Sequence, residues 1–348
     1  MRSGTALLLV ALSAAPASSE TAPVAADARR QLAVGAEHLR AGRLDEAQRC
    51  LEQAARLDPT LPHLHLTLGQ LYSAKKLFPL AVESLERAIS EEPDAPQGHY
   101  LLGITYSLMN EDPKAIAALE RAAGLAPENA AFHYYLGLAY LRSERYPDAV
   151  SSLAESVRLD PGRAEVRSNL AWALMSLGRN GEAVRVLLAS LPGQPLQASA
   201  WFLLGESLRR LGETEKAIGY FEKAIELEGT HADALFSLGT VYALRQDVVR
   251  AVACYQRLLA VDPRHAGAHY QLGKVLLRDG KVDEAITHLE QTVEIRPALK
   301  GAHYQLARAY RLRGQTDKAA READLFRRLG AEEVDDGTWR KDPTTSRP

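Results

Sequence analysis

The sequence predicts an all-α fold, an α-solenoid in which short helical hairpins stack along one axis. Small residues recur every 34 residues, at Gly35, Gly69, Gly103, Gly137, Ala171, Gly205, Gly239, Gly273 and Ala307. A second column, from Ala47 to Ala319, is alanine in all nine copies. A third column, from Pro59 to Pro297, is proline in every copy except Gly229. A period kept without insertion or deletion is typical of a repeat array, not of a domain with one core.

Each 34-residue unit is predicted to form two amphipathic helices. Counted from residue 28, apolar or small residues fall at positions 4, 7, 8 and 11 and again at 17, 20, 24 and 27, which is the spacing of one helical face. Position 15 is glycine or asparagine in six units, where a helix end adopts left-handed backbone angles easily. Glycine at position 8 and alanine at position 20 let the two helices approach closely, and leucine at position 24 fills the seam. One hairpin cannot bury such a face alone, so neighbouring units must stack.

Nine such units fill residues 28–333, and the segments before and after them do not follow the 34-residue repeat. Arg2 precedes the apolar run Ala6–Ala15, which is too short to span a bilayer, and Ala15-Pro16-Ala17 offers a cleavage site. We therefore expect a signal peptide at 1–17, a linker at 18–27 and a polar C-terminal tail at 334–348. These segments predict an exported protein, periplasmic or secreted. A cytosolic N-terminal helix and an uncleaved anchor are the alternatives.

The repeat pattern Leu-Gly-x-x-Tyr followed by alanine and proline resembles the tetratricopeptide repeat. One unit carries it as Leu102-Gly103, Tyr106, Ala115 and Pro127. The resemblance implies a right-handed superhelix in which the first helices line a concave groove that holds an extended peptide or a partner helix. The chain departs from the family where histidine replaces a frequent tryptophan, at His65, His99, His133, His269 and His303. The lysines and asparagines of the family's two-carboxylate clamp are not reproduced, and Asn169 is the only asparagine at position 6, so no asparagine ladder is present.

Composition and motifs exclude several classes of function. Lys and Arg number 42 against 44 Asp and Glu, so the chain lacks the basic excess of a nucleic-acid-binding protein. No catalytic motif is present, and we expect neither an enzyme nor a cofactor. The histidine column is predicted to pack, because adjacent first helices lie about 10 Å apart, whereas zinc ligands lie about 2 Å from the metal. Cys50 and Cys254 are six repeats apart and are predicted to be free thiols.

The candidate binding surface is the stripe of the first helices that the resemblance places in the groove. It is aromatic, and basic toward the C-terminus, at Tyr100, Tyr134, Phe202, Arg209, Arg210, Phe236, Tyr270, Lys274, Arg278, Tyr304, Arg308 and Arg311. The rings either pack between successive helices or contact a ligand, and the charges either bind an acidic segment or are solvated. We expect an exported scaffold that binds a protein or an extended peptide without catalysis. The alternative is a periplasmic subunit of a complex that exports or assembles an envelope polysaccharide.

Overall fold

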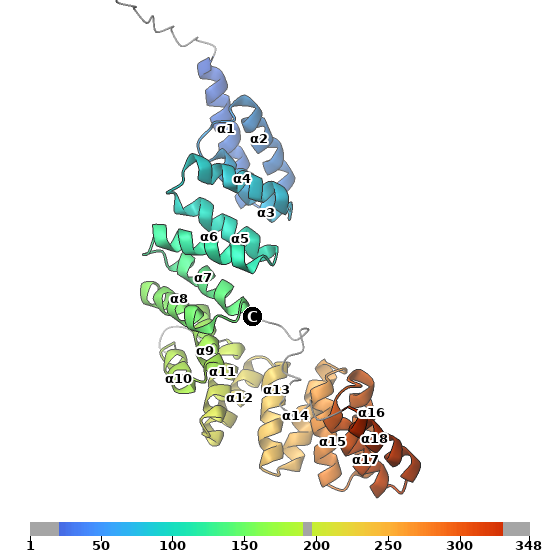
Figure 1. The fold of residues 1–348 in the computed structure, drawn as a ribbon. Coiled ribbons are helices and arrows are strands. Elements are labelled where there is room, and N and C mark those ends of the chain that lie inside the picture. Colours follow the sequence, from blue (N-terminus) through green and yellow to red (C-terminus); the bar gives the residue numbers. More distant parts are fainter. Residues whose placement is uncertain (1–20, 191–196, 330–348) are drawn as a thin grey trace, which may run out of the picture. The chain divides into compact units, whose positions relative to one another are not determined.

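The computed structural model describes residues 21–190 and 197–329. Within these residues the chain forms eighteen α-helices and no strand, which confirms the all-α solenoid (Figure 1). It divides into two compact units, residues 1–160 and 161–348. The predicted signal peptide (1–17) and polar tail (334–348) lie outside the described residues.

The helices come in pairs, and we name the first helix of each repeat the A helix and the second the B helix. The N-terminal unit contains α1 (Thr21–Arg40), α2 (Leu44–Leu57), α3 (Leu64–Ala74), α4 (Phe78–Glu91), α5 (Pro96–Leu108), α6 (Asp112–Leu125), α7 (Ala130–Arg142) and α8 (Tyr146–Leu159). The C-terminal unit contains α9 (Ala164–Ser176), α10 (Asn180–Leu188), α11 (Ala198–Arg210), α12 (Thr214–Leu227), α13 (Ala232–Leu244), α14 (Val248–Val261), α15 (Ala266–Arg278), α16 (Val282–Ile295), α17 (Lys300–Leu312) and α18 (Thr316–Arg328).

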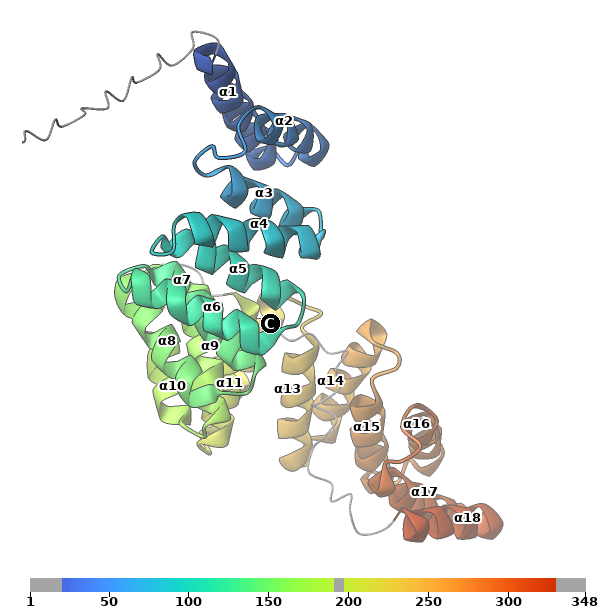
Figure 2. The ribbon, with the colours of Figure 1, turned by 45° about the horizontal axis from the view of Figure 1, so that its top comes forward.

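Within each unit, every A helix packs on the B helix of its own repeat, and that B helix packs on the A helix that follows (Figure 2). Successive A helices also contact each other directly. The first A helix differs from the prediction, because α1 begins at Thr21 and residues 21–27 are helical where we expected a linker. This segment is rich in alanine, and Pro23 lies in the first turn, where its missing N–H breaks no hydrogen bond.

The seam between the A and B helices leaves no room for a side chain at position 8 in the repeats that carry glycine there, whereas the fifth repeat combines Ala171 with Leu187. In all seven repeats with glycine there, an added Cβ atom would lie only 2.5–2.8 Å from the side chain at position 24. That side chain is leucine in five of the seven repeats and Phe221 or Tyr255 in the other two. The ninth repeat combines Ala307 with Ala323, so the added methyl faces a smaller residue.

The turn between the two helices has the same backbone conformation in all nine repeats, although only six carry glycine or asparagine there. The five glycines have φ between 72° and 81°, and Asn110 has φ 60°. Lys76, Glu144 and Gln246 adopt the same left-handed conformation, with φ between 57° and 63°. The amide of the next residue then donates to a carbonyl in the last turn of the A helix, as from Arg145 to Tyr140 O at 2.9 Å. Repeat geometry therefore overrides the cost of a side chain at this position.

Tyrosines at position 11 join neighbouring repeats through polar bonds. The Tyr140 hydroxyl donates to Glu120 at 2.5 Å, and Tyr310 donates to Glu290 at 2.5 Å. Each glutamate belongs to the B helix of the preceding repeat. Burial first, and then the carboxylate, raises the pKa of both tyrosines above its usual range. These phenols therefore remain donors at every physiological pH.

The close packing at the seam predicts that a larger side chain at Gly137 disrupts the packing of one helical hairpin. The Cβ atom of Gly137→Leu would lie 2.6 Å from Leu153 Cγ, so α7 and α8 must separate. We expect the free energy of unfolding to fall by about 1–3 kcal/mol, measured by urea denaturation. The matched control is Gly124→Leu on α6, where nothing lies within 4 Å of an added Cβ. Equal losses in the two variants would show that helix packing at position 8 is not limiting.

Candidate functional site

The candidate site lies on the A helices of the C-terminal unit, which form a continuous layer. Helices α11, α13, α15 and α17 contact one another in succession. Residues of the predicted stripe therefore come from helices that lie side by side, and their side chains can act on one ligand. Tyr100 and Tyr134 belong to the N-terminal unit.

Most of the predicted aromatic residues pack inside the solenoid. Tyr134 and Phe236 are buried, and Tyr270 is only 2% exposed. The Tyr270 hydroxyl would lie 2.7 Å from a Cβ atom at Gly301, so its ring fills the space that this glycine leaves on α17. Tyr100 and Phe202 are half-buried. For these rings the structure favours packing between helices over ligand contact.

Tyr304 is the exception among the six rings. Its side chain is 51% exposed, and its ring lies 5.5 Å from that of Phe326 on α18. A ring that contacts one neighbour and is half exposed can contact a ligand without changing the fold.

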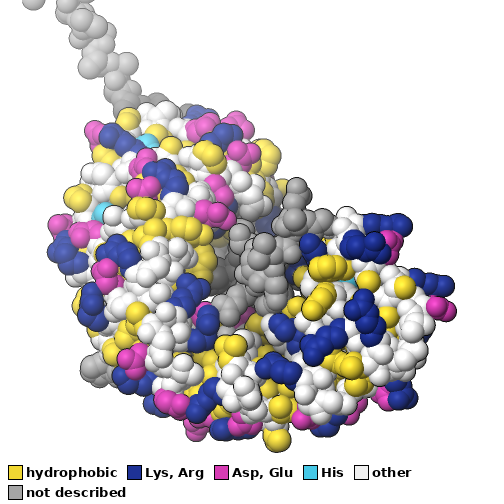
Figure 3. Space-filling model, turned by 60° about the horizontal axis from the view of Figure 1, so that its bottom comes forward, with side chains coloured by type: hydrophobic (Ala, Val, Ile, Leu, Met, Phe, Trp, Pro, Cys, Tyr) yellow, Lys and Arg dark blue, Asp and Glu magenta, His cyan; other side chains and the backbone are white. Residues whose placement is uncertain are grey.

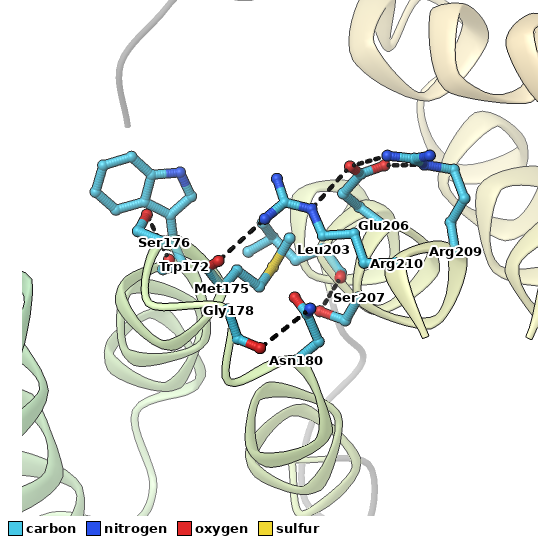
Figure 4. Close-up of polar contacts among 10 residues, drawn as sticks. All are labelled: Trp172, Met175, Ser176, Gly178, Asn180, Leu203, Glu206, Ser207, Arg209 and Arg210. Carbon is cyan, nitrogen blue, oxygen red and sulfur yellow. Dashed lines mark hydrogen bonds and ion pairs between the residues drawn. The ribbon is translucent and has the colours of Figure 1, made fainter. Parts of the chain in front are cut away.

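Arg209 and Arg210 are engaged by a buried acid on their own helix. Glu206 is 2% exposed, and its two oxygens accept from the Arg209 guanidinium at 2.8 Å each (Figure 4). Arg210 also donates to Glu206, at 3.2 Å. The hydrogen bonds to Glu206 raise the pKa of Arg209. On α11, Glu206 therefore offsets one of the two positive charges of the stripe.

Arginine at position 13 has a structural role that the sequence did not indicate. Arg210 donates to Met175 O at 3.0 Å, across to the last turn of the preceding A helix (Figure 4). Arg278 reaches Ala243 O in the same way at 3.4 Å, and Arg142 reaches Ser107 O at 2.7 Å in the N-terminal unit. A cation there satisfies a carbonyl at the negative end of the helix dipole. Arg210 and Arg278 thus connect A helices as well as adding charge to the face.

Arg308 and Arg311 on α17 form neither an ion pair with a carboxylate nor a hydrogen bond to a neighbouring helix among the described residues. Tyr304, Arg308, Arg311 and Leu312 follow the spacing of one helical face, and all four are exposed. Among the described residues, no carboxylate forms an ion pair with Arg308 or Arg311. Lys274 and Arg278 occupy the same stripe on the neighbouring α15. Figure 3 shows Lys and Arg side chains gathered on one face of the C-terminal unit. We call Tyr304, Arg308, Arg311, Lys274 and Arg278 the basic face.

Two histidines that the sequence analysis did not single out support this layer. Nδ1 of His231 accepts from Ala234 N at 3.3 Å, and Nδ1 of His265 accepts from Ala268 N at 2.9 Å, so each caps the start of an A helix. The centroids of their rings lie 5.4 Å from those of Phe202 and Phe236, with the planes tilted by 37° and 38°. Their position immediately before an A helix was the available signal.

The predicted histidine column packs through hydrogen bonds. Nε2–H of His99, His133, His269 and His303 donates to the proline carbonyl six residues earlier, at 2.8–3.1 Å. Because this bond places the proton on Nε2, Nδ1 of His269 is an acceptor, and it lies 3.0 Å from Nδ1 of His288. No group of three or more residues able to hold a metal ion occurs in the described part of the chain.

Both cysteines are free, as predicted. Cys254 is 7% exposed and borders a pocket of about 390 Å³ that is also lined by Glu222, Tyr242, Arg250 and Arg257. Burial raises the pKa of its thiol to about 11, so the thiol is protonated at neutral pH and is a poor nucleophile.

Comparison with family models identifies the repeats. Three models described as tetratricopeptide repeat match residues 38–104 and 276–325, residues 113–164 and 168–229, and residues 96–129. Residues 210–292 also match a model described as anaphase-promoting complex, cyclosome, subunit 3. These matches extend across most of the array. The chain belongs to the tetratricopeptide repeat family.

Solved structures show the same fold at low sequence identity. A structure described as Pseudomonas aeruginosa pilF has a TM-score of 0.53 and 18% identity, and the match covers 61% of this chain and 96% of that one. The APC/C hetero-tetramer Cut9-Hcn1 has a TM-score of 0.55 and 20% identity, over 80% of this chain and 54% of that one. No curated protein matches the chain. Between residues 21 and 329, outside the gap at 191–196, no helix has the length and apolar character needed to cross a membrane.

The contact between His269 and His288 predicts that stability falls in acid. Burial, and then the charge of His269, lower the pKa of His288 below 6.5. The unfolded chain therefore takes up this proton at a higher pH than the folded chain. The resulting contribution to stability is complete above about pH 6.5 and declines as the pH falls toward the folded pKa.

Thermal unfolding at pH 7.5 and pH 5 tests this contribution. We expect His288→Gln to reduce the drop in melting temperature between the two values, with His38→Gln on α1 as the control. A drop that is unchanged in His288→Gln would contradict the assignment.

Proposed function

We propose that the chain is an exported scaffold that binds an acidic protein segment on the basic face of its C-terminal unit. Tetratricopeptide repeat proteins are generally scaffolds for protein interactions and not catalysts. The observation that carries the proposal is the pair Arg308 and Arg311, exposed on α17 without an ion-pair partner among the described residues.

The chemistry of the face favours a carboxylate-bearing partner. A guanidinium presents parallel donors that match the two oxygens of a carboxylate. Arg308 and Arg311 lie three residues apart and so project from the same side of α17. Tyr304 and Leu312, 51% and 60% exposed, offer apolar surface beside them. An extended segment that alternates acidic and apolar side chains matches this arrangement.

Export rests on the sequence of residues 1–17. We expect the mature protein of the native host to begin near Ser18, because Ala15 and Ala17 are the small residues that a signal peptidase requires. N-terminal sequencing of the protein from fractionated cells checks this. Intact Met1 in a cytosolic fraction would remove the export proposal and leave the binding proposal standing.

Charge reversal at Arg308 and Arg311 tests the binding face. The probe is a fluorescein-labelled peptide in which Glu and Leu alternate, measured by fluorescence anisotropy. We expect the wild type to bind it, with weaker binding as salt screens the charges. Arg308→Glu with Arg311→Glu should weaken binding at least tenfold, since charge-assisted bonds contribute about 1.5–3 kcal/mol each.

Two controls accompany this measurement. Arg264→Glu with Arg321→Glu makes the same charge change at exposed residues outside the A helices and should have little effect. A Lys-Leu peptide should not bind. If the two double variants weaken peptide binding equally, net charge explains the loss, and the proposal of a defined site is contradicted.

Tyrosine truncations separate packing from binding on the same face. Tyr304→Ala should leave the melting curve intact and weaken peptide binding, since its ring is exposed. Tyr270→Ala should instead lower the free energy of unfolding by about 3 kcal/mol or more, because it empties a buried site. Unchanged binding in Tyr304→Ala would remove Tyr304 from the face.

A further inference from the structure

The chain itself contains a segment with the chemistry that the basic face requires. Separated by one residue from Leu329, the last described residue, positions 331–336 read Ala-Glu-Glu-Val-Asp-Asp, four carboxylates within five residues around one valine. We call residues 331–336 the acidic segment. We propose that it docks in cis on the basic face and competes with partners for it. This inference rests on the proposed function, because it assigns an occupant to the same face.

The distance from the end of α18 to the basic face fits the length of the segment. α18 ends at Arg328 and packs on α17 in the same hairpin, so its end lies beside the start of α17. Arg308 and Arg311 are 8 and 11 residues from Lys300, which is about 12 and 17 Å along the helix. A step of about 10 Å between packed helices, taken at right angles to the helix axis, gives separations of about 16 and 20 Å. The seven residues from Gly330 to Asp336 extend to about 23–25 Å.

Charge complementarity favours this face over the cations at the C-terminal ends of α17 and α18. The nearby cations Arg327 and Arg328 already pair with Asp324, at 3.4 and 2.7 Å. Arg313, at the end of α17, pairs with Asp283 at 2.8 Å. Arg308 and Arg311 have no such pairing within the described residues.

Tethering makes even weak docking effective. A short tether gives an attached segment an effective concentration of the order of millimolar. If the segment alone binds with a dissociation constant of about 0.1 mM, it reduces the affinity for an external acidic peptide about tenfold. The face would then be largely closed to weak acidic ligands and open to those that bind more tightly than the tail.

The test neutralises the acidic segment in the full chain. The tail-neutral variant combines Glu332→Gln, Glu333→Gln, Asp335→Asn and Asp336→Asn. We expect it to bind the labelled Glu-Leu peptide about tenfold more tightly than the wild type. When Arg308→Glu and Arg311→Glu are added to both proteins, the one with the neutral tail and the one with the wild-type tail should bind the peptide with equal affinity.

A control variant removes four negative charges elsewhere in the same unit. It combines Glu213→Gln, Glu215→Gln, Glu226→Gln and Glu228→Gln, all at exposed positions in or beside α12. We expect its affinity for the peptide to stay within about twofold of the wild type. A gain equal to that of the tail-neutral variant would attribute the effect to net charge and overturn the inference.

The remaining outcomes separate this inference from the proposed function. If the wild type and the tail-neutral variant bind the peptide equally well, the tail does not occupy the face, and the proposed function stands. If neither binds the peptide, the proposed function fails together with the inference. If the difference between the two tails appears only at high protein concentration, together with dimers in sedimentation, the segment docks on a second copy and docking in cis is wrong.

Discussion

The close approach of two helices in each hairpin is the constraint on which the rest of the structure depends. Seven repeats have glycine at position 8, and in each the position-24 side chain occupies the space of the missing Cβ atom. Dispersion and hydrophobic burial at this contact require that the two backbones stay close. The contact fixes the register of each A helix on its B helix. The faces that the A helices present are consequences of that register.

The same residue types perform different tasks according to their place in the repeat. Arginine at position 13 bonds a carbonyl of the preceding A helix, as Arg278 does, whereas Arg308 and Arg311 at positions 9 and 12 point to solvent. Tyr270 is a packing residue because glycine stands opposite it at Gly301. Tyr304 has the same position in the next repeat and is half exposed. Only part of the aromatic and basic stripe is therefore available for binding.

The sequence predicted the architecture almost completely, because periodicity reports a contact repeated nine times. Position 8, position 20 and the turn each appear as a column. In the structure, seven repeats share one close contact at position 8, all nine alanines at position 20 are buried, and all nine turns have a left-handed residue. The first helix was mispredicted at its start because residues before Ala28 have no counterpart in other repeats. The left-handed turns at Lys76, Glu144 and Gln246 carry no local signal, since those residues adopt the conformation only under the geometry of the hairpin.

The candidate site could be predicted only in outline. The sequence identified the stripe and its residue types, but not which arginines are bonded. Glu206 was visible as an acid within a basic stripe, while its burial and its bonds to Arg209 and Arg210 follow from helix packing. The bond from Arg278 joins residues 35 positions apart, and its donor resembles any other exposed arginine in the sequence.

Native-state hydrogen exchange on the Gly239→Ala variant tests most directly whether this contact holds each repeat locally. The added methyl carbon would lie 2.8 Å from the Tyr255 ring, so it must separate α13 from α14. Because each repeat touches only its neighbours, amide protection should fall in α12 to α15 and stay unchanged in α17 and α18. A uniform fall throughout the C-terminal unit would show a single cooperative core and contradict the account.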